Sequence, residues 1–213
     1  MIVAGYSALF HLIVPEVIVI IAALSVLAVD LLLMRGKETR ARFTTGAAIS
    51  CVGCVSAVLW MLIAPQQANV FDGTLVVSRQ TQLVQIALLV LTPFVILLSI
   101  ESTFTKHVGE YLALILFATT GMMFLVSSQN ILLIFVSLEL LSLSLYILAA
   151  FNKRSVQSAE AALKYFLFGG ASAAFMLFGL SLVYGLSGST NLTQIAAAIK
   201  GPSLVRFSRS RLS

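Results

Sequence analysis

Long runs of apolar residues, separated by short polar stretches, dominate the pattern of this chain. Six runs are long enough to cross a bilayer as helices, because about 20 apolar residues span its hydrocarbon core. The runs are unbroken, whereas the strands of a membrane barrel would alternate apolar and polar positions. The pattern therefore predicts an all-α polytopic membrane helix bundle with about six transmembrane helices. In chain order the predicted spans are residues 12–34, 43–64, 83–100, 111–128, 131–150 and 161–186.

Short connections and prolines add detail to these spans. Residues 127–130 form a very short turn, which predicts that the fourth and fifth helices are antiparallel neighbours. Pro93 falls inside the third span and should kink it. Pro15 stands at the start of the first span, where it suits the first position of a helix. Glu16 directly follows it, near the positive end of the helix dipole.

Composition excludes a soluble domain. The 213 residues are 60% hydrophobic and 10% charged, and the mean hydropathy is +1.05, so a soluble domain of this size could not bury the apolar surface. The net charge of +5 lies in loops and in a basic tail. It forms no basic face interleaved with aromatic residues, so we expect no nucleic-acid partner.

Basic loop residues predict the orientation and the division of the chain. Most loop Lys and Arg residues fall in 35–42, 101–110 and 152–160, which share one side, whereas Arg79 stands alone on the other side before the tail. The positive-inside rule then places the N-terminus outside. We divide the chain into a transmembrane bundle, 1–187, and an extracytoplasmic basic tail, 188–213, whose sequence reads as aberrant after about residue 201.

Glu139 is the strongest candidate for chemistry, because it lies near the centre of the fifth span. An ionisable group at that depth costs about 2.5–3.5 kcal/mol on insertion scales and usually faces a bundle interior or a wet cavity. The alternative is a protonated carboxyl that is hydrogen-bonded to a neighbouring helix. Ser142 lies three residues further along, on the same helix face.

Lys164 on the sixth span is the second candidate. Helix rise places it about 10 Å from Glu139 along the membrane normal, too far for a direct ion pair, so a proton would need water or polar groups such as Ser137, Ser142 and Ser144. Glu160 precedes Lys164 by four residues, which equally predicts a surface ion pair and a lysine that snorkels to the interface.

The remaining polar residues favour structural interpretations. Glu16 and Asp30 fall near the ends of the first span, where an acidic group is cheap. Cys51 and Cys54 form a C-x-x-C inside the second span, but without a βαβ context or further ligands they read as small packing residues. His11 and His107 receive no role. The sequence shows no phosphate loop, nucleotide fingerprint, haem ligands or metal site.

At the fifth and sixth spans the sequence resembles subunit N of bacterial respiratory complex I, the NADH:quinone oxidoreductase, which is subunit 2 in mitochondria. The resemblance covers residues 10–200. Its most specific part is the run from Glu160 to Thr190, with EAALKYF and YGLSGST, and the opening PEVIVIIAALSVLAVD and the segment FVSLELLSLSLYILAAF also match.

The resemblance implies an antiporter-like inner-membrane subunit that takes part in proton translocation coupled to NADH oxidation and quinone reduction. It implies Glu139 and Lys164 as members of a proton relay. It also implies that this chain holds no cofactor: NADH, flavin, iron–sulfur clusters and quinone belong to other parts of the complex. The expected partners are other membrane subunits and the lipid bilayer, with quinone only indirectly.

The chain also departs from that family, whose members have about fourteen helices in two inverted repeats. The sequence stops after the sixth span, without the lysine of the seventh helix that the family implies beside Glu139. We therefore expect a truncated N-terminal part. The alternatives are a subunit of a cation/proton antiporter or a membrane-bound hydrogenase, and a non-functional scaffold fragment.

Overall fold

The structure is a computed structural model that describes residues 2–63, 68–70, 75–101, 105 and 107–200. Helices account for most of it. In chain order the elements are α1 (Ile2–Leu32), α2 (Thr39–Ile63), β1 (Ala68–Val70), β2 (Leu75–Val77), α3 (Arg79–Leu98), a 3₁₀ turn (Ser99–Glu101), α4 (Val108–Ser127), α5 (Ile131–Ala149), α6 (Val156–Ser187) and α7 (Leu192–Lys200).

Among the described residues, six helices are long and apolar enough to cross a membrane, which confirms the predicted all-α bundle. Their bounds agree with the predicted spans to within a few residues, except at the first and sixth helices. α1 begins at Ile2, ten residues before the predicted first span. The chain is therefore a multi-pass membrane protein.

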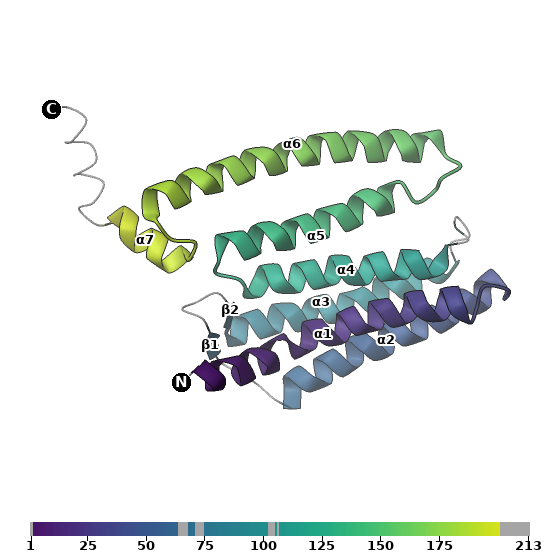
Figure 1. Cartoon of the computed structure of the whole chain (residues 1–213). Coiled ribbons are helices and arrows are strands. Elements are labelled where there is room, and N and C mark those ends of the chain that lie inside the picture. The colour runs from purple at the N-terminus through teal and green to yellow at the C-terminus, as the bar shows by residue number, and fades with distance from the viewer. Residues whose placement is uncertain (1, 64–67, 71–74, 102–104, 106, 201–213) are drawn as a thin grey trace.

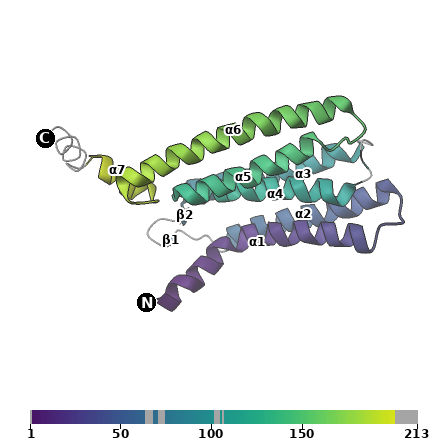
Figure 2. The same cartoon turned by 45° about the horizontal axis from the view of Figure 1, so that its top comes forward.

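Pro15 lies inside α1, so its predicted place at the first position of a helix is wrong. The prediction failed because the apolar run begins at Leu12, whereas the helix itself begins at Ile2. Proline in a helix interior removes one backbone hydrogen bond and bends the helix, and α1 changes direction in its N-terminal part (Figure 2). Glu16 consequently sits in the middle of a helix.

The helices are arranged as a core and an outer pair (Figure 1). α1, α2, α3 and α4 pack against one another, and α5 packs on α4 as an antiparallel neighbour, as the short turn between them predicts. α6 packs on α5 and α7 and lies at the edge of the molecule. Ala162 is the buried residue of α6.

The hydrophobic core lies between α1, α2, α3 and α4. Its members are fully or almost fully buried, and they come from all four helices: among them are Val19, Val26, Phe43, Cys54, Ala57, Leu89, Ile96, Leu112, Leu116 and Met123. Lipid is as apolar as these side chains, so close van der Waals packing, rather than removal from water, holds the four helices together.

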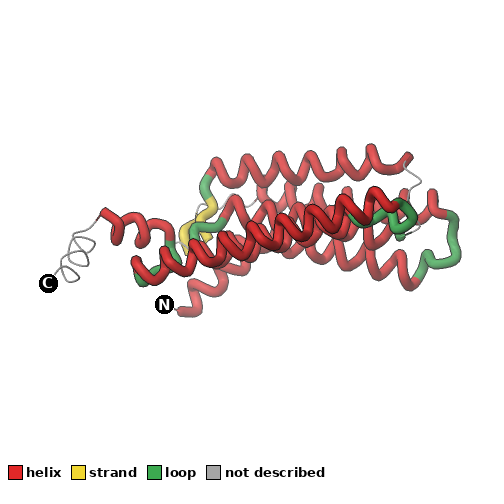
Figure 3. Tube along the Cα trace, turned by 90° about the horizontal axis from the view of Figure 1, so that it is seen from above, coloured by secondary structure: helices red, strands yellow, loops and turns green. Residues whose placement is uncertain are grey.

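The two ends of the bundle differ in charge and in cover. The basic end carries the connections 33–38 and 150–155, with Arg35, Lys37, Lys153 and Arg154 in them, and the start of α4. The hairpin end carries the antiparallel strands β1 and β2, where Ala68 pairs with Val77 (Figure 3). β2 also bridges to Ser128 between α4 and α5, so the hairpin lies against the four-helix core.

A short amphipathic helix follows α6 at the hairpin end. Gly188 ends α6 in the left-handed conformation, with φ of 69°, and α7 then packs back with Ile195 buried. Asn130 and Asn191 form a bridge that joins this segment to the start of α5. The apolar pattern did not predict α7. The segment after residue 200, including Arg206, Arg209 and Arg211, lies outside the described residues.

Candidate functional site

Glu139 lies on the side of α5 that faces α6. Tyr146, seven residues or two helical turns further along the same face, packs edge-on against Tyr165 and Phe166, with ring centroids 4.8 and 5.8 Å apart. Glu139 itself is half-buried, and within the described part of the chain its carboxyl has no hydrogen-bond or ion-pair partner. It is therefore a carboxyl near the middle of an apolar helix that has no polar contact among the described residues.

A close helix contact makes room for Tyr146. A Cβ built on Gly169 of α6 would collide with the Tyr146 ring and its hydroxyl, whereas one on Gly170 would meet nothing within 4 Å. Of the small residues that the sequence places in the sixth span, Gly169 thus provides close packing, as expected for small residues in lipid. Gly179 and Gly185 face open space as well.

Two of the three serines suggested as intermediates lie on the wrong side of α5. Ser137 and Ser144 are both 3% exposed and donate to carbonyls of their own helix, those of Leu133 and Leu140, at 2.7 and 2.8 Å. The Ser137 carbonyl lies against Gly121 of α4, opposite to the face of Glu139. Ser142 remains the serine on that face.

Lys164 forms the surface ion pair that its spacing allows. Its Nζ donates to Glu160 Oε1 at 2.5 Å, and the two side chains are 65% and 59% exposed. The Tyr146 contacts with α6 lie between the levels of Glu139 and Lys164, so the two candidates are well separated along the helices. As predicted, they form no direct ion pair.

Glu16 is a buried acid in the four-helix core, and its predicted place at the interface is wrong. Glu16 is only 3% exposed, which contradicts its interpretation as an interfacial residue at a helix start. Gln85 of α3 donates from Nε2 to Glu16 Oε1 at 2.9 Å and to the Met123 carbonyl of α4 at 3.2 Å. Glu16 Oε2 is buried without a partner in the described structure. These contacts tie α1, α3 and α4 together at one level.

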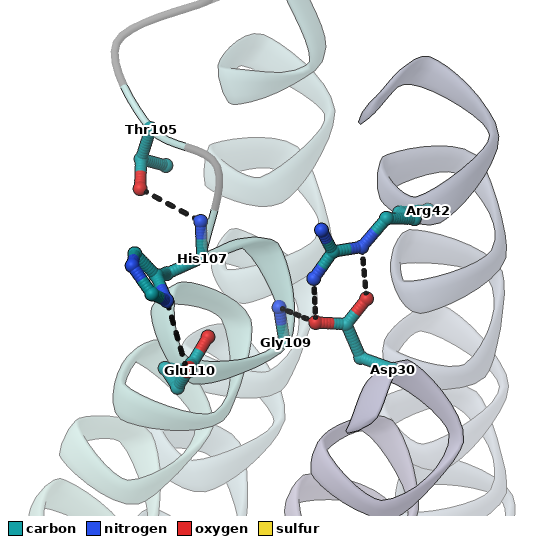
Figure 4. A network of polar contacts seen from close by, with 6 residues as sticks. All are labelled: Asp30, Arg42, Thr105, His107, Gly109 and Glu110. Carbon is teal, nitrogen blue, oxygen red and sulfur yellow. Dashed lines mark hydrogen bonds and ion pairs between the residues drawn. The ribbon is translucent and has the colours of Figure 1, made fainter. Parts of the chain in front are cut away.

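Asp30 belongs to a charged clamp at the basic end (Figure 4). It accepts from Arg42 Nε at 2.7 Å and Nη2 at 2.5 Å, and the Gly109 amide at the start of α4 donates to Oδ2 at 3.0 Å. Bidentate pairing and a helix N-terminus both stabilise a carboxylate. The structural interpretation of Asp30 is confirmed, although it is buried rather than interfacial.

Gly109 is needed for this clamp. A Cβ at that position would lie 2.5 Å from the Asp30 Cβ and 2.7 Å from its Oδ2. His107 and Glu110 form a separate contact of 3.1 Å beside the clamp. The clamp therefore fastens the ends of α1 and α2 to the beginning of α4.

One sequence signal could have identified the Glu16 contact. Gln85 is a strongly polar side chain inside an otherwise apolar span, and such a residue needs a partner within the bundle. Pairing it with Glu16 requires knowledge of how α1 and α3 are rotated toward each other. The spans alone do not provide that rotation.

The cysteines behave as packing residues. Cys54 is 1% exposed in the core, Cys51 is half-buried, and both thiols are free. Across the described residues, no group of three or more His, Cys, Asp or Glu side chains converges as a metal site would require.

Known proteins resemble the chain over most of its length. The transmembrane family described as NADH:quinone oxidoreductase/Mrp antiporter matches residues 128–210. NADH-quinone oxidoreductase subunit N 2 of Acidobacterium capsulatum is 50% identical over 208 residues, which are 93% of this chain and 42% of that protein. Subunit N 1 of Koribacter versatilis is 40% identical over 182 residues, 82% of this chain and 36% of that protein. The chain thus spans about two fifths of the length of these relatives.

Two solved structures share the fold. A chain of respiratory complex I from Thermus thermophilus with bound Aureothin has a TM-score of 0.65 and 30% identity, covering 84% of this chain and 38% of that one. A chain of the membrane-bound sulfane sulfur reductase, an archaeal respiratory membrane complex, has a TM-score of 0.69 at 21% identity, covering 90% and 39%. The second likeness concerns the fold alone.

Proposed function

Because this chain is a homologue of subunit N of the NADH-quinone oxidoreductases over most of its length, we propose that it serves in a membrane subunit of a proton-translocating NADH:quinone oxidoreductase. In that subunit it contributes to proton translocation coupled to NADH oxidation and quinone reduction. It acts as part of a translocase, and no redox step takes place on its own residues.

Glu139 carries this proposal. It is a half-buried carboxyl in the membrane-spanning part of α5, on the face toward α6, and it has no partner in the described structure that would give it a structural purpose. A carboxyl at such depth is costly to keep. It can bind and release a proton when a donor or acceptor approaches along the α6 side.

Lys164 is the proposed second member of the relay. Its ammonium group forms an ion pair with Glu160. This exposed pair contributes little to stability, so a competing partner can replace Glu160. A proton passing between Glu139 and Lys164 would travel through water, because no side-chain contact joins them. Ser142 is the hydroxyl on the Glu139 face of α5 that could support such a chain of water.

The surroundings follow from the same proposal. We place the chain in a bacterial inner membrane with the N-terminus and the hairpin end outside and the basic end in the cytoplasm, in line with the positive-inside rule. The neighbouring structures come from multi-subunit respiratory membrane complexes, which supports other membrane subunits and lipid as partners. NADH, flavin, iron–sulfur clusters and quinone would bind elsewhere in the assembly.

The test is Glu139→Gln in the assembled complex, with protons moved per NADH oxidised measured in sealed membrane vesicles. We expect a lower ratio, because the amide keeps the shape of the side chain but cannot take up or release the proton. Glu38→Gln, the same change at an exposed position between α1 and α2, is the matched control. A normal ratio in Glu139→Gln would refute the relay role.

A second candidate function is cation/proton antiport, either alone or within a membrane-bound hydrogenase. The matched family includes Mrp antiporters, and that is the observation in its favour. It predicts Na⁺/H⁺ exchange in vesicles that contain no NADH dehydrogenase. Exchange abolished by Glu139→Gln under those conditions would favour antiport over a role in NADH oxidation.

A further inference from the structure

Glu16 lies in a site that the relay of α5 and α6 does not use. It belongs to α1 and is closed in by Gln85 of α3 and Met123 of α4, which are 2% and 0% exposed. Glu139 faces α6, on the far side of α5 from α4. The two carboxyls therefore lie on opposite sides of the α4–α5 contact, and no described hydrogen bond connects them.

The hydrogen bonds fix which atom of Glu16 can carry a proton. The Met123 carbonyl can only accept, so the group that Gln85 turns toward it must be the amide nitrogen. That nitrogen donates its second hydrogen to Glu16 Oε1. Oε1 is thus an acceptor. Because a carbonyl oxygen accepts better than a hydroxyl oxygen, the proton of a neutral carboxyl is favoured on Oε2, the oxygen without a partner in the described structure.

Among the described side chains, none that is cationic pairs with Glu16 to hold it as a carboxylate. An ionised carboxylate whose hydrogen-bond donors are all neutral, buried among apolar helices, is far more costly than a neutral one. Arg79, the cationic residue of α3, is exposed and lies six residues before Gln85, about 9 Å of helix rise away.

The other titratable groups described on the helices around Glu16 lie at the basic end or are neutral thiols of the core. Asp30, Arg42, Glu110 and Tyr111 lie at the opposite, basic end, and Cys54 is a core thiol of α2. The described strands carry no titratable residue. The side chains of Tyr6, His11 and Asp72 lie outside the described residues.

A second carboxyl oxygen, Glu110 Oε2, is also buried without a partner in the described structure, but its setting differs. The Glu110 side chain is 37% exposed and its other oxygen pairs with His107, so water reaches this group directly. Glu16 is closed to water on the core side. Seven residues beyond Gln85 along α3, Thr92 pairs with Thr119 at 2.9 Å, and both hydroxyls already donate within this pair or to carbonyls of their own helices.

The short way out for a proton leads to the hairpin end. Gln85 lies six residues, about 9 Å of rise, after the start of α3, and Met123 lies four residues, about 6 Å, before the end of α4. β2 covers this end, with Leu75 and Val77 buried and Leu75 bridged to Ser128. Motion of a short two-stranded hairpin requires far less disruption than opening the helix core.

We propose that Glu16 is a second proton-binding site of this subunit, neutral in the closed bundle, which exchanges its proton with the hairpin end. The exchange breaks the O–H bond at Oε2 and transfers the proton to water, leaving a carboxylate whose Oε1 keeps the Gln85 bond. The inference rests on the proposed function for its purpose in translocation. The binding of a proton at Glu16 can be measured separately.

The first measurement is an infrared difference spectrum of the assembled complex between acidic and alkaline buffer. We expect a band of the protonated carboxyl in the wild type that is lost in Glu16→Gln. Glutamine preserves the acceptor for Gln85, so the bundle should fold. Thr92→Val, a change at a buried polar residue of α3, is the control and should keep the band. A spectrum unchanged by Glu16→Gln would overturn the proposal.

The second measurement is proton translocation per NADH oxidised, with Glu16→Gln and Glu139→Gln in parallel. We expect Glu16→Gln to lower the ratio while Thr92→Val leaves it unchanged. Lost translocation in Glu139→Gln with a normal ratio in Glu16→Gln would overturn the role of Glu16 and leave the proposed function intact. A Glu16 band together with normal translocation in Glu139→Gln would overturn the proposed function and leave the proton-binding site at Glu16 intact.

Discussion

The four-helix core and the α5–α6 pair place acidic residues in opposite surroundings. In the core, Asp30 is held by Arg42 and by the start of α4, and Glu16 is held by Gln85. On the outer pair, Glu139 has no described polar partner, and Lys164 is bound to an exposed glutamate. The difference separates residues that hold the bundle together from residues that are free to exchange partners. A proton bound at Glu139 can leave without disturbing a described contact, whereas at Glu16 it leaves from Oε2, the oxygen that Gln85 does not hold.

Packing follows the same division. In the most apolar 18-residue stretch of α4, 56% of the residues are buried, whereas in that of α6 none is. Large side chains of α6 such as Phe168, Phe175 and Phe178 are mostly exposed. The stability of this chain should therefore depend mainly on α1 to α4, and substitutions at exposed positions of α6 should act on function.

The largest loss of stability is expected for Asp30→Ala. It would leave the Arg42 guanidinium without its counter-ion and the Gly109 amide without an acceptor, which should lower the free energy of unfolding by about 3–5 kcal/mol. Thermal unfolding of the purified protein in detergent measures the loss. Lys37→Ala, an exposed neighbour on the connection to α2, should change stability by less than about 0.5 kcal/mol.

Apolar side chains of α4 and α6 should differ in what they contribute to stability. Leu116→Ala on α4 removes a fully buried side chain and should cost about 2–4 kcal/mol. Phe178→Ala on α6, where the phenylalanine is 64% exposed, should stay within about 0.5 kcal/mol. Equal losses in the same unfolding assay would show that α6 is packed as firmly as α4.

The contact between α5 and α6 offers a smaller test. Gly169→Ala places a methyl group against the Tyr146 ring and should destabilise by about 1–3 kcal/mol through forced repacking. Gly170→Ala adds the same methyl group in open space, so better helix propensity should make it neutral or stabilising by up to about 1 kcal/mol. Equal values for the pair would mean that Tyr146 does not hold α6 in place.

The smallest effect on stability is expected at the exposed ion pair. Lys164→Met and Glu160→Gln each break it, and each should change stability by less than about 0.5 kcal/mol. Their effects on proton translocation should differ, because only Lys164 is a proposed relay member. Equal translocation in the two variants would indicate that Lys164 acts merely as the partner of Glu160.

Particular residues show how far sequence reasoning reached. The turn at 127–130 predicted the antiparallel neighbours α4 and α5, and the i, i+4 spacing predicted the Glu160–Lys164 pair. Both features are local and depend on few residues. Pro15 was placed wrongly, because a helix can continue beyond its apolar run. Ser137 and Ser144 looked available but turned toward α4, since the sequence does not give the rotation of a uniformly apolar helix.

The sequence alone determined the six spans, the charge difference between the two ends and the depth of Glu139. These properties follow from run length against bilayer thickness and from the cost of placing a charge in lipid. The tertiary structure decided which polar groups meet. Glu16 reaches Gln85 across 69 positions, and Asp30 reaches Gly109 across 79. Such contacts depend on the rotation and register of packed helices, which side-chain packing sets and no single span encodes.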